Sequence, residues 1–427
     1  MSKGVKQNQK IRWERLDNTA NLFPAIAGQN MTNVYRISVT LLEEVDGELL
    51  QRALDTVLQR FPNFRVRMRK GIFWHYFETN NKPAPTVREE STYPCMYIEP
   101  YANNNYLFRI TYYRNRINLE VFHVLADGMG GVNFLREVTY EYLRLAHEEL
   151  TGINQDDFSD ETSLNTEDSY LKNYKKSHRK GYQTKRAVEV KGDRLGAGEI
   201  SVFHGYMPMT ELKAVCKKYE VSINELLTAV FLYSIYLEYL HGQPSDKPLA
   251  ASIPVNLRPW FDSDTTRNFF VMVSAVFEPD RENIPFSEVV SIVQKSLRSQ
   301  IKKEHLEELF SYNVSNQKNI FLRSIPIFIK VLAMRMVYRS SARANTTTVT
   351  NIGNIHVEEQ YRAYIKHFHA LISKSVGQNI KGSICSYQDT LVFSITSAFS
   401  DVSIQRRFFR TLAEEDVPVV VESNGIH

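Results

Sequence analysis

One stretch, residues 116–147, places the strongest constraint on how this chain of 427 residues can fold. Between Arg116 and His123, apolar side chains recur at every second position, which is typical of a buried strand. Small residues follow, and Val132 to His147 then has the apolar spacing of a helix. The pattern predicts a strand that ends at His123, a sharp turn made by glycines with positive φ, and a helix after the turn.

The end of this strand carries residues that point to chemistry. A histidine at a strand end, with an acid four residues later, can direct its imidazole into a cavity while the acid points back into the protein. The pattern H-x-x-x-D-G alone is common, and a histidine in this position is often only a hydrogen-bonded structural residue. The interpretation of His123, Asp127 and Gly128 therefore depends on the rest of the chain.

Length and composition bound the class of protein. A chain of this length predicts two domains of about 200 residues each. Apolar residues make up 43% and charged residues 23% of the chain, which is ordinary for a soluble globular protein. The 52 basic and 48 acidic side chains leave a net charge of +4. This balance gives no reason to expect nucleic acid as a partner.

Cysteine spacing and the lengths of apolar runs indicate in which cellular compartment the protein is expected. Cys95, Cys216 and Cys385 are far apart and form neither a disulfide framework nor a zinc pattern, so we expect a cytoplasmic protein. The first residues lack the apolar run of a signal peptide, and no run of about 18 apolar residues predicts a membrane span.

The most apolar region of the chain, residues 320–338, is interrupted by Arg323, Lys330 and Arg335. A helix from Pro326 to Arg339 is expected to line a core with its Lys and Arg side chains reaching outward. The alternative is a weak peripheral association with a membrane surface.

The two halves of the chain repeat one order of elements. The first half predicts strands at 33–43, 64–68, 72–77, 106–113 and 116–123, with helices at 46–59 and 132–147, typical of an α+β layered fold. The second half predicts strands at 199–207, 248–255, 268–277, 346–352, 379–387 and 390–397, with helices at 210–219, 222–240, 285–309, 326–339 and 400–413.

A polar segment, residues 151–198, separates the halves and is interpreted as a linker or crossover. We expect an N-terminal lobe at 1–180, with the linker starting near 151, and a C-terminal lobe at 181–427. The basic part of this linker could attract phosphate groups or an acidic partner, but a solvated surface is the favoured interpretation.

Three motifs stand in a fixed order: His123-Val-Leu-Ala-Asp127-Gly128, then P-V-N-L-R ending at Arg258, then T-N-I-G ending at Gly353. Together they resemble the chloramphenicol-acetyltransferase-like superfamily, which includes condensation domains, plant BAHD acyltransferases, wax ester synthases and alcohol acetyltransferases. The resemblance covers nearly the whole chain. It implies an α+β fold of two α/β sandwich lobes with mixed sheets and an active-site channel between them.

The resemblance also implies a reaction. His123 would act as general base on a hydroxyl or amine acceptor, which then attacks an acyl thioester directly, without an acyl-enzyme. A neutral histidine suits this role near pH 7 and contributes about 10²–10⁴ in rate. Acyl-CoA, or an acyl-pantetheine on a carrier protein, would be the co-substrate, with no tightly bound cofactor and no metal.

Roles for the other motif residues follow from the resemblance. Asp127 would be structural and pair with Arg258, and Gly128 would leave room for the channel. Asn351 is the candidate oxyanion donor, with Asn256 and Thr350 as structural or substrate-binding residues. The alternatives are a surface role for Arg258 and a turn role for Asn351, whose side chain can bond its own backbone.

One departure favours free acceptors over peptide synthesis. Condensation domains usually carry a second histidine directly before the motif, where this chain has Phe122. We therefore expect an acyltransferase similar to the alcohol O-acetyltransferases, acting on a small-molecule acceptor. A free-standing condensation-type enzyme with carrier-bound substrates, and a non-catalytic relative that binds an acyl thioester or a partner protein, are the alternatives.

The sequence patterns for metal binding, serine hydrolysis and nucleotide binding are weaker or absent. His367 and His369 alternate as metal ligands on a strand do, but no third ligand is indicated and exposed histidines are expected. The chain has no G-x-S-x-G elbow and no glycine-rich nucleotide-binding motif.

Overall fold

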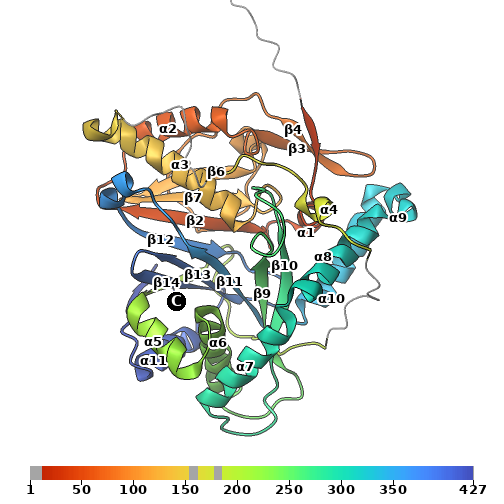
Figure 1. The fold of residues 1–427 in the computed structure, drawn as a ribbon, viewed down its shortest axis with the longest axis vertical. Helices are drawn as coiled ribbons and strands as arrows, with labels where there is room; N and C mark the ends of the chain where they lie inside the picture. Colours follow the sequence, from red (N-terminus) through yellow and green to blue (C-terminus); the bar gives the residue numbers. More distant parts are fainter. Residues whose placement is uncertain (1–11, 153–161, 177–184, 427) are drawn as a thin grey trace, which may run out of the picture.

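The computed structural model describes residues 12–152, 162–176 and 185–426. Two lobes lie one above the other, with the first half of the chain mostly in one and the second half mostly in the other (Figure 1). The predicted boundary near residue 180 lies outside the described residues. No single helix of the described chain has the length and apolarity needed to cross a membrane.

The N-terminal lobe is built on a five-stranded sheet with the order β12-β2-β7-β6-β5. Its strands are β2 (Val34–Leu41), β5 (Arg88–Glu89), β6 (Phe108–Tyr113), β7 (Arg116–Phe122) and β12 (Ile365–Ile372). Helices α2 (Gly47–Arg60) and α3 (Gly128–Ala146) pack on this lobe. Phe134 of α3 stacks on Phe64 at a centroid distance of 4.0 Å, inside the buried core of the lobe.

A second, three-stranded sheet of this lobe has the order β1-β4-β3. Its strands are β1 (Trp13–Arg15), β3 (Val66–Lys70) and β4 (His75–Thr79), and the last two form the predicted hairpin. Two short helices, α1 (Phe23–Ile26) and α4 (Ser169–Lys172), lie near the junction with the other lobe.

The C-terminal lobe is built on a mixed seven-stranded sheet with the order β10-β9-β11-β13-β14-β8-β15. Its strands are β8 (Ser201–Pro208), β9 (Leu249–Asn256), β10 (Phe270–Phe277), β11 (Thr347–Asn354), β13 (Ile380–Tyr387), β14 (Thr390–Ser397) and β15 (Val420–Ser423). Strand β11 runs parallel to β9 and β13, and the other pairs are antiparallel. The predicted α+β class with mixed sheets is confirmed.

The helices of this lobe are α5 (Met209–Tyr219), α6 (Ile223–Tyr239), α7 (Phe286–Gln300), α8 (Lys303–Lys318), α9 (Ile320–Ser324), α10 (Ile327–Ala342) and α11 (Ser403–Glu414). Helix α6 starts at the capping box that the sequence predicts, with Ser222 and Glu225 bonding each other's backbone N–H groups.

Strand β12 ties the lobes together. It comes from the second half of the chain, pairs with β2 in register Phe368–Val39, and lies between the two sheets (Figure 1). The predicted order of elements lacks this strand, because Lys366, His367 and His369 obscure its apolar alternation.

Three predicted elements are corrected. Helix α3 begins at Gly128 rather than Val132, because Asp127 caps it, so the glycines form its first turn and not a turn with positive φ. The single helix predicted at 285–309 is two helices, α7 and α8. Helix α10 does not line a core, since only Ile327 and Ala342 of it are buried.

Candidate active site

The imidazole of His123 lies at the end of β7, where the two lobes meet. Phe23 of α1 stacks on it with ring centroids 4.5 Å apart, and Tyr35 of β2 meets it edge-on at 5.1 Å. Phe270 of β10, from the other lobe, lies 5.6 Å away. His123 as a whole is half-buried.

A hydrogen-bonded chain of three side chains holds this ring. Nδ1 of His123 lies 3.0 Å from Oδ1 of Asn268, and Nδ2 of Asn268 donates to Oδ2 of Asp17 at 3.1 Å. Ionised Asp17 only accepts hydrogen bonds, which turns the amide oxygen of Asn268 towards His123. His123 then carries its proton on Nδ1, and Nε2 keeps a free lone pair. We call Asp17, Asn268 and His123 the relay.

Burial sets the charge of the relay. It lowers the pKa of His123 below the ordinary value of 6.5, against the negative charge of Asp127 and the hydrogen bond with Asn268, which raise this pKa; the positive charge of Lys381 makes a smaller lowering contribution. The imidazole is therefore neutral at pH 7. Burial raises the pKa of Asp17 to about 7 against the hydrogen bonds from Ala20 N–H and Asn268. Lys381 is itself buried on β13, and this burial lowers its pKa to about 7.

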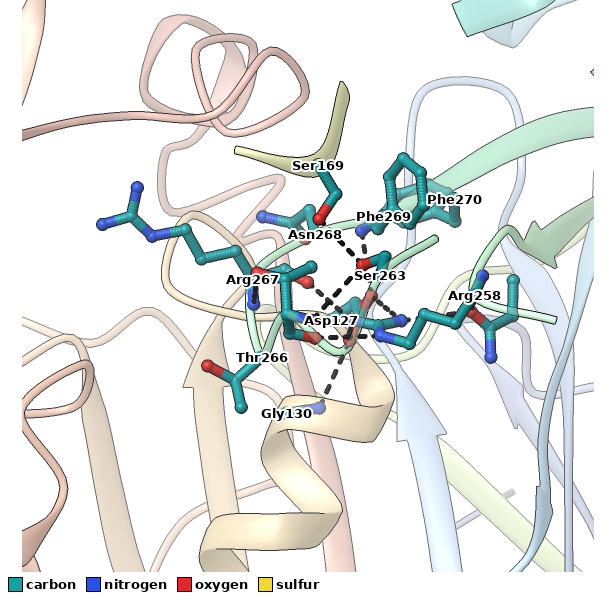
Figure 2. Close-up of polar contacts among 12 residues, drawn as sticks. Asp127, Gly130, Ser169, Arg258, Ser263, Thr266, Arg267, Asn268, Phe269 and Phe270 are labelled. Carbon is teal, nitrogen blue, oxygen red and sulfur yellow. Dashed lines mark hydrogen bonds and ion pairs between the residues drawn. The ribbon is translucent and has the colours of Figure 1, made fainter. Parts of the chain in front are cut away.

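Asp127 has a structural environment. Its Oδ1 accepts the N–H of Gly130 at the start of α3, and its Oδ2 accepts the backbone N–H of Phe269 at 3.1 Å. Nη1 of Arg258 donates to Oδ2 at 2.9 Å, and Nη2 donates to Oδ1 at 3.2 Å. Figure 2 shows Asp127 at the centre of these contacts. The predicted ion pair with Arg258 is present, and it joins the two lobes.

Asn256 and the backbone of the same loop orient Arg258. Oδ1 of Asn256 accepts from the backbone N–H and from Nη1 of Arg258, both at 3.1 Å. The carbonyl oxygens of Thr265 and Arg267 accept from the same guanidinium at 2.9 and 2.7 Å. Asn256 therefore supports the ion pair.

The glycines after Asp127 allow the lobes to approach each other. A Cβ on Gly128 would lie 2.6 Å from Cδ1 of Ile352 on β11. A Cβ on Gly130 would overlap the backbone carbonyl oxygen of Thr266. A side chain is therefore excluded at Gly130, since a backbone carbonyl cannot rotate out of the way.

The geometry does not support the oxyanion role predicted for Asn351. Its side chain is exposed, and its Oδ1 accepts the backbone N–H of Gly353 at 2.8 Å. This is the turn role named above as the alternative. Its neighbour Ile352 points towards Gly128, so strand alternation directs Asn351 to the opposite side. Thr350 is half-buried on the same strand.

His367 and His369 differ from the prediction of exposed histidines. His369 is buried, with Nε2 2.9 Å from the hydroxyl of Tyr206, and His367 is half-buried. His204 lies against His369 at a ring distance of 4.5 Å. The residues that the structure describes contain no cluster of His, Cys, Asp or Glu that could hold a metal. The three cysteines are free and buried.

A basic cavity of about 540 Å³ lies between α1 and α10. Four cations line it, namely Arg194, Arg335, Arg339 and Lys374, together with uncharged residues. Within the described ranges, none of the four forms an ion pair with an acid. We call this space the basic cavity.

The basic cavity is linked to His123 by one short segment. Ile26 and Met31 line the cavity. Phe23, in the same helix as Ile26, stacks on His123, and the carbonyl of Asn33 accepts the backbone N–H of His123 at 2.9 Å.

Comparison with solved structures defines the class of fold. TRI101 of Fusarium sporotrichioides, solved with coenzyme A and T-2, superposes with a TM-score of 0.65 at 10% identity, covering 97% of this chain and all of that one. Trichothecene 15-O-acetyltransferase from the same organism gives 0.60 at 11% identity, covering 97% and 96%. Polyketide synthase associated protein 5 from Mycobacterium tuberculosis gives 0.60 at 12% identity, covering 93% and 96%.

Condensation domains share the same architecture. The domain from the Monacolin K polyketide synthase gives a TM-score of 0.57 at 10% identity, covering 95% of this chain and 96% of that one. The chain thus has the two-lobed fold of the chloramphenicol-acetyltransferase-like proteins, as the resemblance implied. No protein-family model matches the chain, and no curated protein matches it by sequence.

Sequence reasoning missed two members of the relay. Asn268 lies two residues before β10, where the sequence predicts the start of a strand, and Asp17 is one polar residue of the N-terminal segment that precedes the first predicted strand. Neither belongs to a recognisable motif. The only signal was the position of Asn268 ten residues after Arg258, in the same loop.

Proposed function

We propose that this protein is an acyltransferase that moves an acyl group from a coenzyme A or carrier-protein thioester to a hydroxyl or amine. One observation carries the proposal: a neutral imidazole of a half-buried histidine at the junction of the lobes, with Nδ1 held by Asn268 and Nε2 free. This arrangement suits a general base. The shared fold with acetyltransferases and condensation domains is consistent with it.

The reaction has three proton and bond changes. Nε2 of His123 takes the proton of the acceptor hydroxyl or amine as that group attacks the thioester carbonyl carbon. The tetrahedral intermediate then collapses, the carbon–sulfur bond breaks, and the thiolate leaves. His123 returns the proton to the thiolate, so the base is regenerated without a metal or an acyl-enzyme.

The relay serves the charged stage of this cycle. When His123 is protonated, its Nδ1–H still donates to Asn268, whose amide group donates in turn to ionised Asp17. The negative charge of Asp17 therefore favours the imidazolium through one intervening amide. The role is positioning, since neither Asp17 nor Asn268 needs to touch the substrate.

The basic cavity supports a phosphate-bearing donor. Arginine and lysine side chains without acidic partners are suited to phosphate groups. Coenzyme A carries several phosphates, whereas a carrier-bound pantetheine has one, so the four cations favour coenzyme A. We assign the donor phosphates to this cavity and the thioester to the His123 side of the linking segment.

A thiol-release assay with acetyl-CoA and a panel of alcohols and amines tests the proposal. Release should require an acceptor and fall by about 10²–10⁴ in His123→Ala. His147→Ala is the matched control, because His147 is a half-buried histidine that contacts Tyr364, remote from the relay. Carrier-loaded acyl groups form a second arm, which distinguishes the condensation-type alternative.

Two results would contradict the assignment. A His123→Ala enzyme that turns over at the full rate would remove His123 as base. No release with any donor, together with measurable binding of acyl-CoA, would instead identify a non-catalytic binder.

A further inference from the structure

Helix α10 exposes apolar side chains over much of its length. Phe328, Leu332 and Met336 recur at every fourth position, and Ile329 and Val337 flank them. Phe328 is 68% exposed and Val337 is 70% exposed. Large apolar side chains scattered singly over a surface are ordinary, but a contiguous group marks an interaction site.

Two further segments carry exposed apolar side chains, the helix that precedes α10 in the chain and the turn between β3 and β4. Ile320 and Phe321 of α9 are exposed. Ile72 and Phe73, in the turn between β3 and β4, are exposed as well. We call the residues that make up this surface the α9–α10 face: Ile72, Phe73, Ile320, Phe321, Phe328, Ile329, Leu332, Met336 and Val337.

Hydrogen bonds hold the turn beside α10. The backbone N–H of Ile327 donates to the carbonyl of Ile72 at 3.0 Å, and Nζ of Lys330 donates to the carbonyl of Phe73 at 3.3 Å. Lys330 also lies 3.5 Å from the ring centroid of Trp74. The β3–β4 hairpin reaches towards this side of the molecule in Figure 1. The face is therefore built from both lobes.

Cations and no acids accompany the apolar residues along this part of the sequence. From residue 319 to 345 the sequence contains Arg323, Lys330, Arg335, Arg339 and Arg343 but neither Asp nor Glu. At 3.6 residues per turn, the exposed apolar side chains of α10 span about half of the helix circumference. Lys330 lies at one edge of this arc and Arg335 at the other, and Arg339 lies just inside the arc, between Phe328 and Leu332.

This pattern identifies the occupant by its chemistry. A helix with an exposed apolar face and cations along its edges binds at the interface of a bilayer, where headgroups are anionic and acyl chains lie beneath. A symmetric contact between two copies would bring the same cations face to face, which opposes self-association through this surface.

We infer that the α9–α10 face docks on an anionic lipid bilayer, with its apolar side chains at the level of the acyl chains and its bordering cations among the headgroups. This association is peripheral. Arg335 and Arg339 also line the basic cavity, so the bilayer contact shares these two cations with the donor site proposed above.

Vesicle sedimentation with the purified full-length protein tests the inference. The protein should pellet with vesicles of phosphatidylglycerol and phosphatidylcholine in equal parts, and not with phosphatidylcholine alone. Raising the salt from about 0.1 M to about 1 M, which shortens the Debye length from about 10 Å to about 3 Å, should weaken binding. The triple variant F328S/L332S/M336S should lose affinity by about tenfold or more, equivalent to about 1.4 kcal/mol.

A matched variant controls for apolar surface in general. Leu42, Tyr101 and Val420 are exposed elsewhere on the described chain, so L42S/Y101S/V420S should bind vesicles like the wild type. Both triple variants should melt at the wild-type temperature, because the substituted side chains are exposed.

Three outcomes would overturn the inference. They are a wild-type protein that does not pellet with anionic vesicles, a triple variant of α10 that pellets as well as the wild type, and a wild-type dimer in solution that this variant dissociates. The last result would assign the face to a second copy of the chain.

Discussion

At the scale of single residues, the state of His123 depends on two side chains that are remote in sequence. Asn268 lies 145 positions away from His123, and Asp17 lies 251 positions away from Asn268. Between them they select the tautomer of the imidazole. Removing a partner that fixes the tautomer of a catalytic histidine can lower turnover strongly even when the geometry is kept.

The substitution Asp17→Asn tests the relay. The new amide can donate to Oδ1 of Asn268, which would turn the Nδ2 of Asn268 towards His123. Nδ1 of His123 must then accept, so the proton moves to Nε2 and blocks the base. We expect kcat to fall by about 10²–10⁴, with an unchanged melting temperature, in the thiol-release assay.

Asp17→Glu should lower kcat for a different reason. Its carboxylate can still accept from Asn268, but the longer side chain displaces it by one methylene. A wild-type rate in Asp17→Asn would show that the orientation of Asn268 does not matter.

The pH dependence follows from the same residues. The base requires neutral His123, whose pKa is lowered below 6.5, and the relay works best with ionised Asp17, whose pKa is raised to about 7. Both conditions are lost as the pH falls. We expect kcat/KM to be constant above about pH 8, to decline through pH 7, and to decline more steeply below 6.5. In Asp17→Asn the decline of kcat/KM through pH 7 should disappear, because the side chain at position 17 no longer titrates. Rates that increase from pH 8 to pH 6 would contradict this order.

At the scale of elements, Asp127 combines the cap of α3 with the contact between lobes. Its carboxylate accepts from Gly130, Phe269 and Arg258, so a single side chain holds the first turn of α3 against the loop before β10. This explains why an acid follows the histidine at this spacing without taking part in proton transfer.

Asp127→Ala should therefore act mainly on stability. The loss of one cap and of the charge-assisted bonds to Arg258 predicts a decrease of about 3 kcal/mol in the free energy of unfolding, measured by denaturant titration. Asp46→Ala is the matched control, because Asp46 caps α2 through Glu48 and Leu49 N–H groups on the surface. It should lose only about 1 kcal/mol. Equal losses in the two variants would argue against the special role of the Arg258 pair.

At the scale of the whole molecule, the lobes meet where side chains are absent. Gly128 faces Ile352 of β11, and Gly130 faces the carbonyl of Thr266. Strand β12 adds a second link, since it completes the sheet of the N-terminal lobe with residues from the C-terminal half. The position of His123 relative to Asn268 depends on this docking.

Gly130→Ala tests the close approach. In a helix, alanine is favoured over glycine by about 1 kcal/mol, so propensity alone predicts a more stable protein. The overlap with Thr266 predicts the opposite, a loss of about 1–3 kcal/mol, and a lower rate because Asn268 is displaced with its loop. Gly152→Ala, which has no atom within 4 Å of the added Cβ, should leave the melting temperature unchanged. A stabilised Gly130→Ala protein would show that the lobes can separate freely.

Local patterns in the chain were enough to predict secondary-structure elements and to single out the motif residues. Period-two alternation predicts β7, the capping box predicts the start of α6, and the H-x-x-x-D-G and P-V-N-L-R motifs predict that Asp127 meets Arg258. These features depend on neighbours within a few positions, or on a pattern of residues that the resemblance recognises as a unit. The helix at 326–339 was also predicted as an element, although not its exposure.

Tertiary structure alone decided what lies around the imidazole. Asp17 and Asn268 carry no local pattern, and they meet only because the N-terminal segment that contains Asp17 and the loop before β10 converge at the end of β7. The apolar periodicity of α10 is the same whether a helix faces a core or a solvent-exposed surface, so its burial depends on whether another element packs against it. Long-range packing determines both the tautomer of His123 and which face of α10 is exposed.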